Sequence, residues 1–353
     1  MEDFTKSRTM VFPRDVRVGH GAIDELGSVL NDLGAREEVL LVTGRTTRLL
    51  AGERALEVVR KAGYSASMIQ VSGATLEDVA VAEVEARRVK ARVVLGVGGG
   101  SVIDVAKLAA YRVGVPYISV PTSASHDGIT SPRASIKEDT GSSSKRANTP
   151  TAIVADTSII VKAPYRMLTA GCADAISNST AVLDWKLAHR LRSEEYSSFA
   201  AVLAESAADM IIENAGVIKP GLEESAWLVV KSLIVSGVSM SVAGSSRPAS
   251  GAEHMFSHTL DEIAPGRAYH GEQVGVGSIM MMNLHGGDWK AIRDALNTLG
   301  APTTAKQLGV TPDIVVEALC RAHLNKPDRY TILGDKGLTR EAAMELVRVT
   351  GVA

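Results

Sequence analysis

The sequence predicts an α/β fold: a Rossmann-like N-terminal domain with a parallel sheet, followed by an all-α C-terminal domain. Two observations predict it. Short β-branched runs alternate with helical patterns in the first half of the chain, and long helical patterns replace them beyond about residue 160. Strand–helix alternation is typical of a parallel sheet with helices on both faces. We therefore expect one domain over residues 1–160 and a second over residues 161–353.

The first half contains several apolar runs of strand length, separated by helical segments. Strands are predicted at 39–44, 65–71, 93–100, 115–122 and 151–156, and helices at 46–63, 76–90 and 101–113. Gly63 follows the first of these helices as a C-cap. A polar insert, residues 126–150, separates the last two strands, and its central part EDTGSSSKR predicts an exposed hairpin or loop.

The second half shows no convincing strand pattern. Amphipathic or wholly apolar helical stretches occupy residues 168–191, 197–215 and 226–244.

Composition excludes several classes of protein. A net charge of −2 gives no basic excess to neutralise a phosphate backbone, so we expect no nucleic-acid partner. The apolar stretches of the sequence are too short to predict a membrane-spanning protein, and the first ten residues lack an apolar signal core. Cys172 and Cys320 are too few for a disulfide framework. We expect a cytoplasmic protein, and we expect it to form a homo-oligomer.

A glycine-rich segment, GVGGGSVIDVAK (96–107), lies where a strand is predicted to end and a helix to begin. Glycines let the backbone approach a phosphate, and a helix N-terminus offers N–H groups and a positive dipole end. The dinucleotide fingerprint GxGxxG is not met cleanly, because position 101 is Ser. A tight turn without a ligand is the alternative.

The end of the first predicted strand bears on the choice of cofactor. A carboxylate often holds the adenosine ribose at such a strand end, but here the residues are Thr43, Gly44 and Arg45. With no carboxylate to repel a 2′-phosphate and Arg45 to attract one, NADP is expected as well as NAD. The alternative is that Arg45 points into water.

Three separate segments offer metal ligands. Asp174 lies on a predicted helix, His254 and His258 are spaced i, i+4 on one helical face, and His270 begins an apolar helix. One carboxylate and two imidazoles suit a borderline divalent ion and leave positions open for a substrate. By spacing alone, packed core histidines are the more common interpretation.

Taken in order, GGGSVIDVAK, PTSASHDGITSPRAS, GCADAISN, SSRPASGAEHMFSH and HGEQVGVG resemble the sn-glycerol-1-phosphate dehydrogenase family. This family is part of the wider group of iron-containing alcohol dehydrogenases, glycerol dehydrogenases and dehydroquinate synthases. The resemblance covers roughly residues 10–350. It implies a dehydroquinate synthase-like fold with a cofactor-binding N-terminal domain, a metal- and substrate-binding helical domain, and an active site in the cleft.

The resemblance also implies site residues. Asp174, His254 and His270 match the ligands of one Zn²⁺ per chain. Asp127, Asp174 and His258 match substrate-binding positions, and Asp127 and His258 are the candidates for proton transfer. The positions that match cofactor contacts are Gly98, Gly99, Gly100, Ser101, Val102, Thr122, Ser123, Ala124, Ser125 and Ser131.

The family reaction is NAD(P)H-dependent reduction of dihydroxyacetone phosphate to sn-glycerol 1-phosphate, which in archaea supplies the backbone of membrane phospholipids. We expect that reaction here, with a metal polarising the carbonyl. The sequence does not choose a phosphate-binding residue among Arg133, Arg247, Lys326 and Arg329. Glycerol dehydrogenase, a dehydroquinate synthase-type lyase, a bacterial relative that uses nickel and a non-catalytic binding protein remain alternatives.

Overall fold

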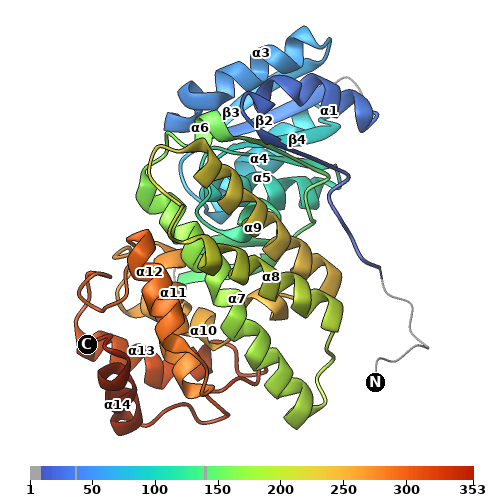
Figure 1. Ribbon diagram of the computed structural model, residues 1–353. Coiled ribbons are helices and arrows are strands. Elements are labelled where there is room, and N and C mark those ends of the chain that lie inside the picture. Colours follow the sequence, from blue (N-terminus) through green and yellow to red (C-terminus); the bar gives the residue numbers. More distant parts are fainter. Residues whose placement is uncertain (1–8, 36–37, 139–140) are drawn as a thin grey trace. The chain divides into compact units, whose positions relative to one another are not determined.

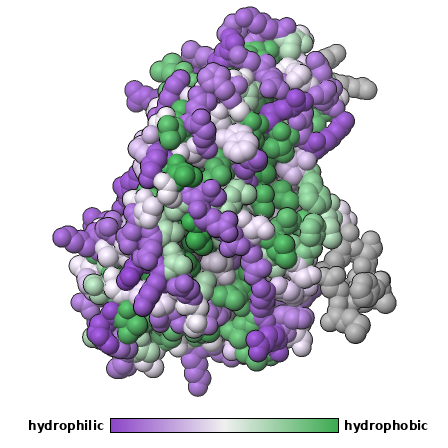
Figure 2. Space-filling model, viewed as in Figure 1, coloured by the Kyte–Doolittle hydropathy of each residue, from purple (hydrophilic) through white to green (hydrophobic). Residues whose placement is uncertain are grey.

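The computed structural model describes residues 9–35, 38–138 and 141–353, and the chain folds into two compact units (Figure 1). The sheet unit contains Val11–Leu168 and Pro220–Ser241, and the helical unit contains Thr169–Lys219 and Val242–Ala353. The units are not continuous in sequence, unlike the predicted domains, because Pro220–Ser241 returns to the sheet unit. In the view of Figure 2, areas of hydrophobic surface lie between hydrophilic ones.

The sheet unit is built on six parallel strands among the described residues, in the order β1-β8-β5-β4-β2-β3. These strands are β1 (Asp15–Gly19), β2 (Glu38–Gly44), β3 (Ser65–Val71), β4 (Val93–Gly98), β5 (Tyr117–Pro121) and β8 (Ala152–Asp156). The chain runs outward from β2 to β3 and then returns to β4 on the other side of β2. Open α/β sheets bind ligands beyond the carboxyl ends of strands at such a reversal.

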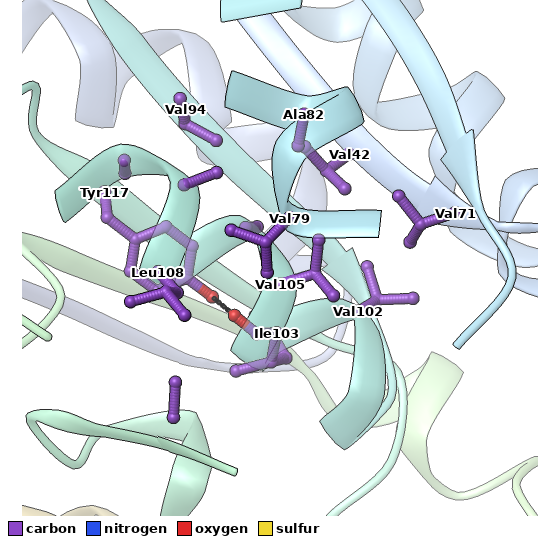
Figure 3. Packing of buried hydrophobic residues seen from close by; sticks show 14 of the residues in the cluster. Val42, Val71, Val79, Ala82, Val94, Val102, Ile103, Val105, Leu108 and Tyr117 are labelled. Atoms are coloured by element: carbon purple, nitrogen blue, oxygen red, sulfur yellow. Dashed lines mark hydrogen bonds between the residues drawn. The ribbon is translucent and has the colours of Figure 1, made fainter. Parts of the chain in front are cut away.

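Alternate residues of the central strands face opposite cores. Val39 and Leu41 pack with one set of helices, while Val42 and Val94 pack with another, which contributes Val105. Figure 3 shows the second core, in which the Tyr117 hydroxyl donates to the backbone oxygen of Ile103 at 3.3 Å. Burial on both faces is the reason that these strands consist of almost continuous apolar residues.

Helices cover both faces of this sheet. They are η1 (Ala22–Glu25), α1 (Leu26–Asp32), α2 (Arg45–Thr47), η2 (Arg48–Gly52), α3 (Glu53–Lys61), α4 (Leu76–Arg88), α5 (Gly100–Val113), η3 (Asp127–Ile129), α6 (Thr157–Ile160) and most of α9 (Glu223–Ala243). The predicted strands and the helices α4 and α5 are confirmed. The single helix predicted over 46–63 is instead α2, the π-helical segment η2 and α3.

Two parts of the sheet unit differ from the prediction. The edge strand β1 was not predicted, because its short sequence DVRVG contains only two apolar residues, Val16 and Val18. The polar insert forms an antiparallel hairpin of β6 (Arg133–Glu138) and β7 (Gly141–Arg146), but β6 is not wholly exposed. Ala134 and Ile136 are fully buried in the core beside α5, so alternate residues of this strand belong to the interior.

The described residues of the helical unit contain no strand, which confirms the predicted all-α half. Its elements are most of α7 (Tyr165–Arg192), α8 (Ser198–Asn214), η4 (Arg247–Ala249), α10 (Ala252–Ile263), α11 (His270–Leu284), α12 (Trp289–Leu299), α13 (Pro312–Asn325) and α14 (Arg340–Thr350).

Among the described residues, α9 alone is long and apolar enough to cross a membrane, and 61% of its most apolar window is buried within the protein. Its polar side chains bond to the sheet unit. Ser236 donates to the Asp127 carboxylate at 2.8 Å, and the Ser241 and Thr149 hydroxyls lie 2.6 Å apart. These contacts are typical of a helix packed in a protein core.

Candidate metal centre and cofactor-binding loop

The three predicted metal ligands come together in the helical unit. Asp174 lies on α7, His254 in the first turn of α10, and His270 at the first residue of α11. One candidate ligand atom from each lies within 4.8 Å of the others, and the His270 Nε2 atom is 3.9 Å from an Asp174 carboxylate oxygen. Asp174 is buried, and the two histidines are partly exposed. The described residues contain no other group that meets this geometry.

Glycines on α11 allow these helices to approach one another. A Cβ on Gly271 would lie 2.0 Å from the backbone oxygen of Ala170 on α7, and one on Gly277 would lie 3.2 Å from the Cα of Glu253 on α10. The first contact leaves no room for any side chain. The sequence HGEQVGVG therefore provides both a ligand and the close packing that brings it beside the other two.

A chain of hydrogen bonds sets the orientation of His270. The Ser257 hydroxyl donates to the Gln273 side-chain oxygen at 2.7 Å, and the Gln273 amide donates to Asp261 at 2.8 Å. Because the Ser257 proton is used in this way, its oxygen accepts from the His270 Nδ1 at 3.0 Å. The lone pair of His270 is consequently on Nε2, the atom that faces Asp174.

His254 is oriented by its own neighbour in sequence. Its Nδ1 atom lies 2.9 Å from the carboxylate of Glu253, which is fully buried and also accepts from the Gly251 amide at 2.6 Å. Burial raises the pKa of Glu253, but the hydrogen bonds from His254 and Gly251 outweigh it, so that the pKa lies below its ordinary value. The ionised carboxylate accepts the Nδ1 proton and leaves Nε2 of His254 as the remaining ligand atom.

This donor set fits a divalent metal ion. One buried carboxylate and two neutral imidazoles with fixed Nδ1 protons are the ligands and supporting contacts usual at zinc and iron sites. Three protein ligands leave further positions open. The site therefore has the composition of a catalytic metal centre rather than of a closed structural one.

His258 lies beside this triad. Its ring centroid is 6.4 Å from that of His254 and 5.8 Å from that of His270. Burial lowers the pKa of His258 to about 3, helped by neighbouring positive charges of which Lys326 contributes most, so the imidazole is neutral at physiological pH. Its Nδ1 atom is buried and has no hydrogen-bond partner among the described residues. The substrate-binding role of His258 stays a prediction.

A buried carboxylate joins the segments around the metal centre. Asp184, fully buried on α7, accepts the backbone amides of Ala252 and Ile332, each at 2.7 Å, and lies 3.0 Å from the Nε2 atom of His285. Burial raises the pKa of Asp184 above its ordinary value. This one side chain therefore ties the helix of Asp174 to the start of the helix of His254 and to the segment after α13.

The glycine-rich segment forms the turn between β4 and α5 in the sheet unit. Gly98 ends the strand, Gly99 precedes the helix in extended conformation, and Gly100 is its first residue. A Cβ on Gly98 would lie 2.6 Å from the Cβ of Val102, whereas one on Gly99 would meet only the Ser123 hydroxyl, at 3.3 Å. Gly98 is thus needed for close strand–helix packing, and the first backbone amides of α5 form a site suited to an anion.

The remaining predicted cofactor residues lie beside this turn. Thr122 donates its backbone N–H to the Gly98 oxygen at 3.0 Å, which places the segment after β5 against the loop. That segment contains Thr122, Ser123, Ala124 and Ser125. Ser131 is buried a few residues further on, and Ser101 and Val102 are in the first turn of α5. The structure brings the start of this segment against the turn, and the cofactor contacts of all these residues stay predictions.

A fully buried lysine anchors the segment that contains Asp127. The Lys107 ammonium donates to the backbone oxygens of Gly128 and Arg133, both at 2.6 Å, and lies 3.2 Å from Asp104. Asp127 itself is partly exposed and accepts from Ser236. The two predicted proton-transfer residues therefore belong to different units, Asp127 to the sheet unit and His258 to the helical unit.

Sequence reasoning missed the residues that support the ligands. Glu253 and Ser257 contact the two metal histidines, Gln273 bonds to Ser257, and Asp184 joins their segments. A signal was present, because Ser257 and Gln273 follow His254 and His270 by three residues, on the same helical faces.

All four basic candidates for phosphate binding have bonded partners in the fold: Lys326 bonds to Ser250, and Arg329 bonds to Ser250 and Ser246. The Arg133 guanidinium donates to the backbone and hydroxyl oxygens of Ser144, within the hairpin. The Arg247 guanidinium is paired with Glu194 and donates to the backbone oxygen of Tyr330 at 3.0 Å.

Comparisons with known proteins agree with the fold and with the predicted family. A family model described as iron-containing alcohol dehydrogenase matches residues 17–164. A glycerol-1-phosphate dehydrogenase (NAD(P)+) of Methanothermobacter thermautotrophicus is 54% identical over 98% of this chain and 99% of its own length. The protein of the same name from Methanosarcina acetivorans is 55% identical over 98% of this chain and 97% of its own.

Solved structures show the same fold at much lower identity. The crystal structure of glycerol dehydrogenase from Schizosaccharomyces pombe is similar with a TM-score of 0.81 at 21% identity, covering 98% of this chain and 91% of that one. A probable glycerol dehydrogenase from Sinorhizobium meliloti gives a TM-score of 0.77 at 21% identity, covering 98% of each chain.

Proposed function

This chain belongs to the glycerol-1-phosphate dehydrogenase family, and we propose that it reduces dihydroxyacetone phosphate to sn-glycerol 1-phosphate with NADH or NADPH. The observation that carries the proposal is the convergence of Asp174, His254 and His270 in a chain that also has an anion-binding turn at the end of β4. A metal triad would polarise the substrate carbonyl, and a dinucleotide loop would hold the hydride donor, so the two together suit a metal-assisted carbonyl reduction.

We assign the metal as one Zn²⁺ per chain, held by Asp174, His254 and His270. The contacts with Ser257 and Glu253 support a divalent ion here, because they leave the Nε2 atoms of both histidines as ligand atoms. When bound, the ion supplies Lewis acidity that stabilises negative charge on the substrate oxygen. Asp174 also serves as a substrate-binding residue at the same centre.

The cofactor is assigned to the turn between β4 and α5. Residues Gly98 to Val102 bind the pyrophosphate through backbone amides, and Thr122 to Ser125 with Ser131 contact the rest of the cofactor. Arg45 is exposed just after β2, the strand beside β4, where it can pair with the 2′-phosphate of NADP. We therefore propose that the enzyme accepts both nicotinamide cofactors.

The reduced substrate oxygen must gain a proton. His258 is our first candidate for the relay because its imidazole lies beside the two metal histidines, one helical turn from His254 on α10. Asp127 is the second, acting through a substrate hydroxyl or water, and the Ser236 hydroxyl orients its carboxylate.

The biological setting follows from the reaction. We propose that the product enters archaeal-type phospholipid synthesis and that the enzyme acts in the cytoplasm. We also propose a homo-oligomer, since Phe199 and Val202 expose 51% and 57% of their surface three residues apart on α8. Residues 1–160 and 161–353 are proposed as the cofactor-binding and the metal- and substrate-binding domains.

The decisive test follows oxidation of NADH and NADPH by the zinc-loaded protein with dihydroxyacetone phosphate, and then determines the stereochemistry of the product. We expect reduction that requires the phosphate and yields sn-glycerol 1-phosphate. Equal activity with unphosphorylated dihydroxyacetone would point to a glycerol dehydrogenase instead. Phosphate release without net cofactor oxidation would point to a dehydroquinate synthase-type lyase.

A further inference from the structure

His126 follows the predicted cofactor residue Ser125 and lies against the turn between β4 and α5. A Cβ built on Gly100, the first residue of α5, would lie 2.0 Å from the Nε2 atom of His126. The imidazole therefore occupies the place that a side chain at position 100 would take. Because the Cα–Cβ bonds of a helix tilt toward its N-terminus, this nitrogen lies on the N-terminal side of the first turn. His126 is partly exposed, so a ligand can reach it.

Two glycines leave the space that this ring occupies. A Cβ on Gly128 would lie 2.3 Å from the Cε1 atom of His126, and one on Gly100 would overlap the Nε2 atom. Neither glycine has a positive φ, so the backbone conformation does not require glycine at either position. The space for the imidazole is the reason for glycine that the fold shows at both positions.

The hydrogen bonds of His126 determine which ring nitrogen carries the proton. The Gly128 backbone N–H donates to Nδ1 at 3.0 Å, so Nδ1 holds a lone pair and the proton of the ring is on Nε2. Within the described part of the chain, Nε2 has no hydrogen-bond partner. The Gly128 peptide is also held at its oxygen, which accepts from the buried Lys107 ammonium at 2.6 Å. The ring is thus fixed with an N–H donor at the start of α5.

We infer that His126 binds the pyrophosphate of the nicotinamide cofactor through its Nε2–H group, an assignment that rests on the proposed function. The first turn of a helix leaves backbone N–H groups without partners inside the helix, and Gly99 before it has no side chain to cap them. An imidazole N–H beside these amides adds a directed donor to the same anion site. A phosphate oxygen is a strong acceptor for such a donor because it is charged.

Two rival roles of His126 predict different effects. If the side chain only caps η3 through Nδ1, a residue that keeps this bond replaces it without loss of cofactor affinity. If the ring instead blocks the turn until the cofactor displaces it, removing the ring strengthens cofactor binding. A pyrophosphate ligand predicts weaker binding when the Nε2–H group is lost, and recovery when another N–H group takes its place.

Two substitutions separate the ring nitrogens. His126→Asn places an amide oxygen near the Nδ1 position, and Asn is a favourable N-cap residue, so the Gly128 bond is kept while the donor is lost. His126→Gln places an amide N–H near the Nε2 position. In fluorescence titration of the zinc-loaded proteins, we expect NADH affinity to fall about tenfold in His126→Asn, as for loss of a charge-assisted hydrogen bond, and to stay within about threefold of wild type in His126→Gln.

His189→Asn removes an exposed histidine of the helical unit and is the matched control, with wild-type affinity expected. Wild-type affinity in His126→Asn would reduce the residue to a cap and contradict the assignment. Tighter binding in His126→Asn would show that the ring blocks the turn, which also contradicts it. An equal fall in His126→Asn and His126→Gln would assign the effect to the bulk of the ring rather than to its N–H group.

A second ligand locates the contact on the cofactor. ADP-ribose carries the pyrophosphate but lacks the nicotinamide, so its affinity, measured by displacement of NADH, should also fall about tenfold in His126→Asn. Unchanged affinity for ADP-ribose would overturn the pyrophosphate contact.

Both titrations are made without substrate, so they separate this assignment from the proposed function. If wild type binds NADH through His126 but does not reduce dihydroxyacetone phosphate, the proposed function fails and the assignment stands. If wild type reduces that substrate while His126→Asn binds NADH as tightly as wild type, the assignment alone fails.

Discussion

The two units of this protein build their candidate sites in different ways. In the sheet unit, the cofactor-binding turn is a continuous stretch of chain, Gly98 to Val102, and backbone amides at a helix start are its binding groups. In the helical unit, Asp174, His254 and His270 come from three helices, and buried side chains orient two of them. The cofactor-binding turn depends on glycines, which have no side chains. The metal centre depends on hydrogen bonds between buried side chains.

The largest expected effect comes from removing a metal ligand. His254→Ala leaves two ligands, so we expect metal affinity to fall by more than about 100-fold and reduction of dihydroxyacetone phosphate to be lost. His20→Ala, which removes an exposed histidine from the sheet unit, is the control. Metal analysis after dialysis measures the outcome. One retained ion per chain in His254→Ala would show that His254 is not a metal ligand.

Glycine replacement in the turn tests the other half of the comparison. Gly98→Ala places a Cβ 2.6 Å from that of Val102, so we expect a loss of about 1–3 kcal/mol of unfolding free energy. Gly99→Ala meets only the Ser123 hydroxyl, so its stability should stay near wild type while affinity for NAD(P)H falls about tenfold, because the methyl group keeps the pyrophosphate from the backbone. Denaturation and fluorescence titration separate the two effects. Unchanged cofactor affinity in Gly99→Ala would remove this loop from the cofactor site.

A smaller effect than the loss of a ligand is expected from a side chain that supports a ligand without binding metal. Ser257→Ala removes the acceptor of the His270 Nδ1 proton, and we expect zinc affinity to fall about 10- to 100-fold. Thr259→Val is the matched control on the same helix, since within the described part of the chain the Thr259 hydroxyl bonds only to the Met255 backbone oxygen. Competition with a chelator measures the zinc affinity of both variants. An equal change in the two variants would show that Ser257 acts only through helix packing.

The smallest expected effect concerns a carboxylate that bonds to the backbone near its own helix. Burial raises the pKa of Asp78, but bonds from the Ser72 and Gly73 amides and the Thr75 hydroxyl outweigh it, so the folded-state pKa lies below its ordinary value. A depressed carboxyl pKa stabilises the fold above the ordinary pKa, and this contribution is lost as pH falls through the folded-state value. Asp78→Asn should therefore cost about 1 kcal/mol at pH 7, and the difference from wild type should shrink below about pH 4. Denaturant unfolding at both pH values is the measurement, and a difference independent of pH would exclude the ionic contribution.

The sequence predicted the central strands well because they are buried on both faces. Runs such as VLLVTG have almost no polar residue, so no alternation is needed to recognise them. The edge strand β1 and the inner face of β6 escaped prediction for the converse reason. Val16 and Val18 are interrupted by charged residues, and Ala134 and Ile136 lie within a polar segment. Only their neighbours in the fold show that these residues pack.

The sequence by itself determined the strand–helix order, the glycine turn and the three residue types that suit a metal, because each is a local pattern or a short motif. Tertiary structure decided what depends on distant segments meeting. The approach of α11 to α7 through Gly271 brings the three ligands together, and Ser257 and Glu253 select the ring nitrogens that face the metal. The basic residues show the same division, since all four are equivalent in sequence, and only the fold shows that Arg133 bonds within the hairpin and that Arg247 pairs with Glu194.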